Sequence, residues 1–253
     1  MPQKKHLWFA VLIAFVLCTG GCATTSATTP HPCVEAAVNP VLPLCETNLT
    51  EAQCRERTEF IAAQTEKTVL IWAASYTQTD GVFYHRGTGT FVKENGLVVT
   101  AEHVVRDADF ISIDVRRFSQ NRKEILRVRG VKMQIIAVSR EKDIAFLLPK
   151  TTETLPAPMP MLARPIDASE QLWQFGTTSL WRHGPFVKDD VSAQGFTGLF
   201  KVDIVSDGGD SGGPLVTEKG ELAGVLIRNE KFGESPTYFV PIADALTVLE
   251  KQR

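Results

Sequence analysis

Short apolar runs separated by turn residues dominate the chain between residues 68 and 241. Residues 69–72 form one such run, and two others, at 89–92 and 97–100, flank Asn95-Gly96, a dipeptide that strongly favours a hairpin turn. Residues 110–115 alternate between apolar and polar side chains. Runs of this length predict β-strands, and their regular spacing predicts barrels or sandwiches.

A proline-rich segment divides these predicted strands into two sets. Residues 151–165 contain four prolines: Pro156, Pro158, Pro160 and Pro165. Proline lacks the N–H that a strand ladder requires, so this density is incompatible with a continuing sheet. We therefore expect two β units, at about 66–150 and 166–241, joined by a linker at 151–165.

Two helices are expected outside the strand pattern. Thr50 and Gln53 have the spacing of a capping box, which predicts a helix from residue 50 to about 64. Residues 242–252 carry apolar side chains at helical spacing and predict a closing helix.

The N-terminus has the pattern of an export signal. A basic head is followed by a short apolar core at residues 7–18 and by small residues that end at Cys22. The core is too short for a membrane-spanning helix. The small residues resemble a bacterial lipobox, in which the cysteine is lipidated, although Thr19 stands where Leu is usual. We expect a signal peptide at 1–21 and a lipid on Cys22; a plain signal cut near Ala23 is the alternative.

The segment after the signal predicts a tether in an oxidising compartment. Residues 23–43 are rich in Thr, Ala and Pro, which is typical of a flexible tether. We therefore assign 22–59 to a lipidated tether with the first helix, and 60–253 to the folded body. The five cysteines all precede Arg55: Cys18, Cys22, Cys33, Cys45 and Cys54. If Cys22 carries lipid, one disulfide and one thiol remain among the last three; if it is retained without lipid, three connectivities are possible.

Composition narrows the class of protein. The chain has 253 residues, of which 43% are hydrophobic and 22% charged, as in ordinary globular proteins. Lys plus Arg is 27 and Asp plus Glu is 29, a balance that gives no electrostatic case for nucleic acid as a partner. The cysteine spacings match no zinc motif, and we expect neither a metal nor a cofactor.

Three segments carry candidate chemistry. They are Thr100-Ala101-Glu102-His103, Lys142-Asp143-Ile144-Ala145, and Gly208-Gly209-Asp210-Ser211-Gly212-Gly213-Pro214. Taken singly, His103 suits a core histidine, Asp143 a cap, and the glycine-rich segment a tight turn. A serine hydroxyl needs an adjacent base, however, and an imidazole oriented by a carboxylate supplies one.

Together, in this order, the segments resemble those of trypsin-like serine proteases. The resemblance implies an all-β fold of two six-stranded antiparallel barrels. It also implies Ser211 as nucleophile, His103 as general base and then acid, and Asp143 as the orienting carboxylate. The oxyanion hole would be the N–H groups of Gly209 and Ser211. Asp107, Asp109 and Asp114 are rival carboxylates.

The chain also departs from secreted digestive relatives. It has no new amino terminus of the Ile-Val-Gly-Gly type to pair with Asp210, so a partner or a switch for this carboxylate is expected. The disulfide-free body is more similar to the bacterial high-temperature-requirement branch, although that branch usually has Asn at this position. We expect no PDZ domain after the protease body.

The sequence contains few signals for the residues of the specificity pocket. By the resemblance its floor is Val205, and the absence of an acid there argues against cleavage after Arg or Lys and for an apolar or small P1 side chain. Arg228 lies in the expected wall and either lines the pocket or points to solvent.

The sequence thus predicts a lipid-anchored serine endopeptidase of a bacterial cell envelope that acts on peptides or proteins and needs no cofactor. Two alternatives are a catalytically silent, protease-like lipoprotein that binds envelope partners and an esterase that uses the same site.

Overall fold

The computed structural model describes residues 49–77, 81–118, 125–151, 153–177, 181–230 and 233–252, all within one compact unit, Pro32–Arg253. The predicted signal peptide, the lipidation site Cys22 and most of the tether lie outside these residues. Within the described part of the chain, no helix combines the length and the apolar character needed to cross a membrane.

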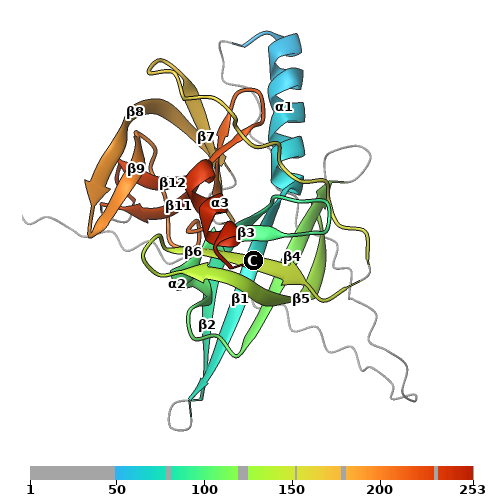
Figure 1. Ribbon diagram of the computed structural model, residues 1–253. Coiled ribbons are helices and arrows are strands. Elements are labelled where there is room, and N and C mark those ends of the chain that lie inside the picture. The colour runs from blue at the N-terminus through green and yellow to red at the C-terminus, as the bar shows by residue number, and fades with distance from the viewer. Residues whose placement is uncertain are drawn as a thin grey trace, which may run out of the picture. The chain divides into compact units, whose positions relative to one another are not determined.

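Two closed antiparallel barrels of six strands form the body (Figure 1). The first barrel consists of β1 (Thr68–Thr77), β2 (Gly81–Phe91), β3 (Val98–Ala101), β4 (Phe110–Phe118), β5 (Ile125–Ser139) and β6 (Ile144–Pro149). The second consists of β7 (Gln171–Phe175), β8 (Trp181–Ala193), β9 (Phe196–Val202), β10 (Pro214–Thr217), β11 (Leu222–Asn229) and β12 (Thr237–Pro241). The fold class expected from the resemblance is confirmed.

Register within the first barrel follows the predicted hairpin. Phe91 of β2 pairs with Val98 of β3, and the connection turns at Gly96, which has a φ of 77°. The order around this barrel is β1-β2-β3-β6-β5-β4, so β3 pairs with β6 although β4 and β5 lie between them in the sequence. This crossover brings the chain after β3 next to the chain before β6.

The segment 151–165 connects the two barrels. The N–H of Met159 donates to the carbonyl of Phe91 at 2.8 Å, and the N–H of Leu162 donates to the carbonyl of Leu222 at 2.9 Å. These bonds reach β2 of the first barrel and β11 of the second. The described residues of this segment contain no strand beyond an isolated bridge between Met161 and Leu222, in keeping with its prolines.

Two helices flank the barrels. Helix α1 (Glu51–Glu66) begins at the Thr50 capping box, as predicted, and continues slightly beyond the expected end at about residue 64. Helix α3 (Ile242–Glu250) buries Ile242, Ala245 and Val248, and it lies against β11 and β5, one strand from each barrel (Figure 1). Both helix predictions are therefore confirmed.

One hydrophobic core extends through both barrels. Its fully buried aromatic side chains include Phe91 and Phe146 from the first barrel and Phe175 from the second. A smaller cluster around Leu172 and Phe239 fills the rest of the second barrel. Packing of this kind fixes the relative position of strands that come from distant parts of the chain.

Candidate active site

Register between β3 and β6 places His103 beside Asp143. Ala101, at the end of β3, pairs with Ile144, at the start of β6. The short helix α2 (Glu102–Val105) continues from β3 and carries His103, while Asp143 directly precedes Ile144. The two candidate residues therefore lie at adjacent ends of neighbouring strands.

The Asp143 carboxylate binds His103 through both of its oxygens. The His103 backbone N–H donates to Oδ1 at 2.8 Å, and Nδ1 of the imidazole lies 2.6 Å from Oδ2. A carboxylate only accepts hydrogen bonds, so Nδ1 carries the proton and Nε2 of the neutral ring is left as a base. Asp143 is 1% exposed, whereas the His103 side chain is 32% exposed.

The backbone at Asp143 is held in an uncommon conformation. Its φ is 52°, a left-handed value that is costly for residues other than glycine. The Asp143 carbonyl accepts the Glu102 N–H at 3.0 Å, so α2 binds both the main chain and the side chain of this residue. Strain of this kind persists only where surrounding contacts overdetermine the geometry.

The rival carboxylates have other partners. Asp109 accepts the Tyr76 N–H at 2.8 Å, and Asp114 accepts the indole N–H of Trp72 at 3.1 Å. Asp107 is exposed and lies 3.5 Å from Arg140. Among the described acids, only Asp143 is hydrogen-bonded to the His103 ring.

Ser211 lies in the connection between β9 and β10 of the second barrel, where this connection contacts the first barrel. Its carbonyl accepts the N–H of Thr88 on β2 at 2.8 Å. The next residue, Gly212, packs so closely against Thr88 and Thr100 that a Cβ would overlap both. Because β3, which contains Thr100, leads directly into α2, these contacts bring Ser211 to the part of the chain that carries His103.

The segments that carry Ser211 and His103 both contact β2 and β3, but the two residues are not hydrogen-bonded to each other. Within the described residues, the Ser211 hydroxyl makes no hydrogen bond, and neither does Nε2 of His103. A catalytic hydrogen bond is often formed only when substrate is present, so this geometry is compatible with a nucleophile and its base.

The N–H groups of Gly209 and Ser211 are available as donors. Neither of them donates to an acceptor in the part of the chain that the structure describes. Gly209 has a φ of 98° and occupies the third position of a turn closed by the Asp210 N–H and the Asp207 carbonyl at 3.1 Å. A positive φ at this position defines a type II turn and explains the glycine.

The Asp210 carboxylate is fully buried and accepts a hydrogen bond from within its own loop. It accepts the Asp207 N–H at 3.1 Å, and it lies against Gly176 so closely that a Cβ there would overlap it. The Gly176 carbonyl in turn accepts Nη1 of the buried Arg116 at 3.2 Å. A buried carboxylate needs such hydrogen bonds to be tolerated.

The two predicted pocket residues occupy the second barrel. Val205 follows β9, and its carbonyl accepts Nη1 of Arg182 at 3.0 Å, while the same guanidinium binds Asp207. The Arg228 guanidinium lies over the Phe196 ring, 5.3 Å from its centroid, and contacts Gln194. Arg228 is thus engaged by neighbouring side chains of its own barrel.

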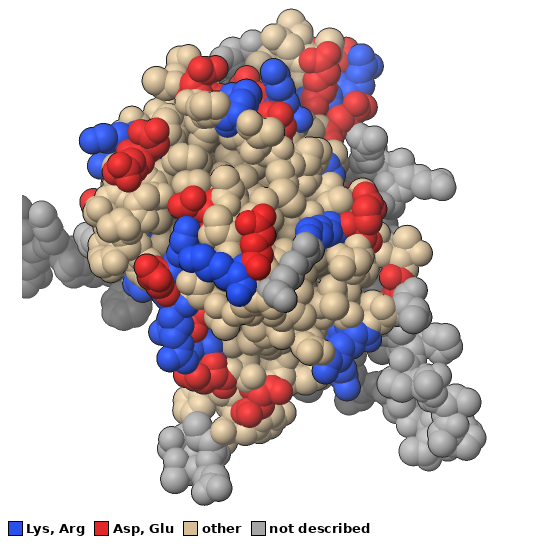
Figure 2. Space-filling model, viewed as in Figure 1, with Lys and Arg blue, Asp and Glu red and all other residues tan. Residues whose placement is uncertain are grey.

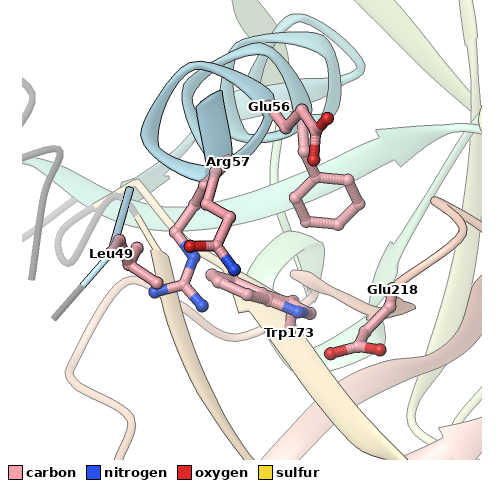
Figure 3. A pocket seen from close by; sticks show the side chains of 7 residues that line it. Leu49, Glu56, Arg57, Trp173 and Glu218 are labelled. Carbon is pink, nitrogen blue, oxygen red and sulfur yellow. The ribbon is translucent and has the colours of Figure 1, made fainter. Parts of the chain in front are cut away.

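A separate pocket lies between α1 and β7 (Figure 3). It has a volume of about 370 Å³ and is lined by Leu49, Gln53, Glu56, Arg57, Phe60, Trp173 and Glu218. The Arg57 guanidinium covers the Trp173 ring at 5.4 Å, and Phe60 meets this ring edge-on. None of the predicted site residues lines this pocket.

The described residues give neither a charged patch on the face drawn in Figure 2 nor a cluster of metal ligands. On the face seen in Figure 2, basic and acidic side chains are interspersed. Throughout the described ranges, no group of three or more His, Cys, Asp or Glu side chains is placed to hold a metal ion.

Sequence reasoning missed Thr88 and Thr177. Their hydroxyls donate to the Gly209 carbonyl at 2.8 and 3.0 Å. Thr88 lies in the buried half of β2, and Thr177 follows β7. Neither position has a local signal that would connect it to the Ser211 loop.

Comparison with known families supplies an independent finding. A family model described as the trypsin-like peptidase domain matches residues 87–225, just over half of the chain, and this range contains His103, Asp143 and Ser211. A comparison with curated proteins finds no match. Two closed six-stranded antiparallel barrels are the architecture that the family predicts. The chain belongs to the trypsin-like peptidase family.

Proposed function

We propose that the protein is a serine endopeptidase that cleaves peptide bonds through an acyl-enzyme on Ser211. The observation that carries this proposal is the pairing of the His103 ring with the buried Asp143 carboxylate at 2.6 Å. This pairing leaves one imidazole nitrogen as a base, and the Ser211 loop presents N–H groups of Gly209 and Ser211 that have no acceptor among the described residues. Family membership supports peptidase activity in general.

Acylation begins when Nε2 of His103 removes the proton from the Ser211 hydroxyl. The Ser211 oxygen then bonds to the carbonyl carbon of the substrate, whose oxygen becomes an oxyanion. The N–H groups of Gly209 and Ser211 donate to this oxyanion. Collapse breaks the bond to nitrogen, and His103 gives its proton to the departing amine.

Deacylation repeats these steps with water as the nucleophile. His103 takes a proton from water, the hydroxyl attacks the acyl ester, and Ser211 leaves with the proton returned by His103. Asp143 stays ionised and stabilises the imidazolium that forms in both halves. The fixed N–H donors contribute most to the stabilisation of the transition state, because they are already oriented when negative charge develops on the substrate oxygen.

The specificity proposal rests on Val205. Its apolar side chain and the absence of an acid at this position favour an apolar or small P1 residue. A panel of fluorogenic peptides that differ only at P1 tests this, with fastest cleavage expected after Ala, Val or Leu. Fastest cleavage after Lys or Arg would overturn this assignment.

We also propose that the protein acts in a bacterial cell envelope, anchored by a lipid on Cys22. The basic head, the short apolar core and the small residues before Cys22 support export and lipidation. Mass spectrometry of the mature N-terminus is expected to find diacylglyceryl on Cys22. A free, unmodified N-terminus at Ala23 would contradict the anchor but not the catalytic assignment.

Hydrolysis of internally quenched peptides by the wild type and by Ser211→Ala tests the activity. The wild type is expected to cleave peptides with multiple turnover, and the variant is expected to have a kcat at least about 10⁴-fold lower. Turnover of activated esters without peptide cleavage would favour the esterase. A folded wild type inert toward both would favour a silent binding protein.

A further inference from the structure

Thr88 binds both residues that carry the proposed oxyanion donors. Its backbone N–H donates to the Ser211 carbonyl at 2.8 Å, and its hydroxyl donates to the Gly209 carbonyl at 2.8 Å. Thr88 lies on β2 of the first barrel and is fully buried. A single residue of one barrel therefore fixes two points in a loop of the other.

Thr177 supplies a second anchor at the same carbonyl. Its hydroxyl donates to the Gly209 carbonyl at 3.0 Å, and its N–H donates to the Thr88 hydroxyl at 3.2 Å. The Thr88 hydroxyl also lies 3.2 Å from the Thr177 hydroxyl, but the shorter contact of its single proton, 2.8 Å, is with the Gly209 carbonyl. The two hydroxyls thus act on one acceptor.

Thr88 is itself bound to the strand that leads to the general base. The Thr100 hydroxyl donates to the Thr88 carbonyl at 2.7 Å, and Thr100 lies on β3 just before α2, which carries His103. A continuous set of hydrogen bonds therefore connects the β3–α2 segment, through Thr88, to the loop with Gly209 and Ser211. The distance between the base and the oxyanion donors depends on this connection.

We propose that Thr88 is a positioning residue that holds the Gly209 and Ser211 N–H groups in place relative to His103, with Thr177 as its second anchor. The inference rests on the proposed function. Preorganised donors stabilise a transition state only while their position is fixed, and small displacements weaken them. The loop around Gly209 has no strand pairing of its own, so these side-chain bonds replace a ladder.

The chain offers a matched control two positions away on the same strand. Thr90 is also fully buried, but its hydroxyl has no hydrogen-bond partner among the described residues. Thr88→Val and Thr90→Val therefore make the same change of atoms in similar surroundings, and only the first removes an anchor. Thr88→Ser keeps the hydroxyl and tests rescue.

Kinetics on a fluorogenic peptide give the first readout. Thr88→Val is expected to lower kcat roughly two- to tenfold with KM little changed, because the loss of the hydroxyl bonded to the Gly209 carbonyl and the Thr177 N–H loosens the oxyanion donors. Thr88→Ser is expected to restore most of kcat, and Thr90→Val to match the wild type. Thr88→Val combined with Thr177→Val is expected to cost more than either change alone.

Amide NMR gives a second readout that does not require activity. In Thr88→Val, the Gly209 and Ser211 amide signals are expected to broaden or exchange faster with solvent, while in Thr90→Val they match the wild type. Unchanged amides in Thr88→Val, or a kcat equal to that of Thr90→Val in an active enzyme, would overturn the inference. If the amides loosen in Thr88→Val but the wild type hydrolyses no peptide, the role of Thr88 in holding the loop is supported and the proposed peptidase activity is refuted.

Discussion

The imidazole of His103 is oriented by one buried carboxylate that contacts both its ring and its backbone N–H. This double contact matters because it fixes the tautomer as well as the ring direction. The carboxylate is placed by a residue with left-handed backbone, Asp143, whose φ is 52°. At the scale of the residue, the site therefore depends on a conformation that is unfavourable in isolation and is held by α2.

Replacing Asp143 with Asn tests this dependence. The amide presents an N–H₂ as well as an oxygen, so the ring can adopt the tautomer in which Nε2 carries the proton and is no longer a base. We expect kcat to fall by a factor on the order of 10⁴ with little change in KM. The matched variant Asp109→Asn, which changes a carboxylate that accepts the Tyr76 N–H in β1, is expected to keep full activity. An Asp143→Asn enzyme within tenfold of the wild type would exclude Asp143 from the proposed role.

At the scale of elements, the Ser211 loop meets β2 and β3 through Gly212. Both Gly212 and Gly195 have positive φ, but a Cβ on Gly212 would overlap Thr88 and Thr100, whereas a Cβ on Gly195 has open space around it. Comparing substitutions at the two glycines therefore separates the effect of backbone strain from the effect of a steric clash. Gly212 is required for both reasons and Gly195 for only one.

Alanine substitution at each glycine is expected to differ accordingly. Gly195→Ala should cost about 1–2 kcal/mol of unfolding free energy from strain alone and leave activity unchanged. Gly212→Ala should destabilise the protein by more than this and reduce kcat, because the loop must move away from β2. Urea denaturation and peptide hydrolysis of both variants measure the difference. Equal stability and activity of the two would contradict the close contact.

Just before β7, the Arg164 guanidinium forms an ion pair with the Glu170 carboxylate that can also be tested. Two hydrogen bonds of 2.8 Å from the guanidinium lower the pKa of the Glu170 carboxyl below 4.5. A carboxyl whose pKa is lower in the folded state than in the unfolded state stabilises the fold above the unfolded pKa. This contribution is lost as the pH falls through the folded pKa.

The stability difference between the wild type and Glu170→Gln is therefore expected to depend on pH. The wild type should be more stable at neutral pH, and its advantage should shrink as the solution is acidified below the ordinary glutamate pKa. Urea denaturation across this range measures the effect. A difference that stays constant with pH would show that the charge of Glu170 contributes nothing.

Elements differed in how well the sequence predicted them. The hairpin around Asn95-Gly96 and helix α1 were predicted because a turn dipeptide and a capping box are local signals. The long strand β8 is mostly exposed and therefore has no apolar run. No pattern in the sequence predicted it. His103, Asp143 and Ser211 were found through segments of known type. Thr88 and Thr177 were not, because their role arises only from contacts between residues far apart in the chain.

At the scale of the whole molecule, the candidate site consists of residues from both barrels. His103 and Asp143 come from the first barrel and Ser211 from the second, and a core shared by both barrels holds the two together. The linker and α3 add contacts to both sides of this junction. The proposed catalysis would therefore require the complete two-barrel body rather than either barrel alone.

Covalent labelling with a fluorophosphonate tests this account most directly. The Ser211 oxygen, activated by His103, is expected to bond to phosphorus and displace fluoride, and peptide mapping by mass spectrometry should locate the adduct on Ser211. Folded Ser211→Ala should not react, and Asp143→Asn should react much more slowly. A folded wild type that remains unlabelled, or that is labelled at another residue, would contradict the central claim that Ser211 is an activated nucleophile.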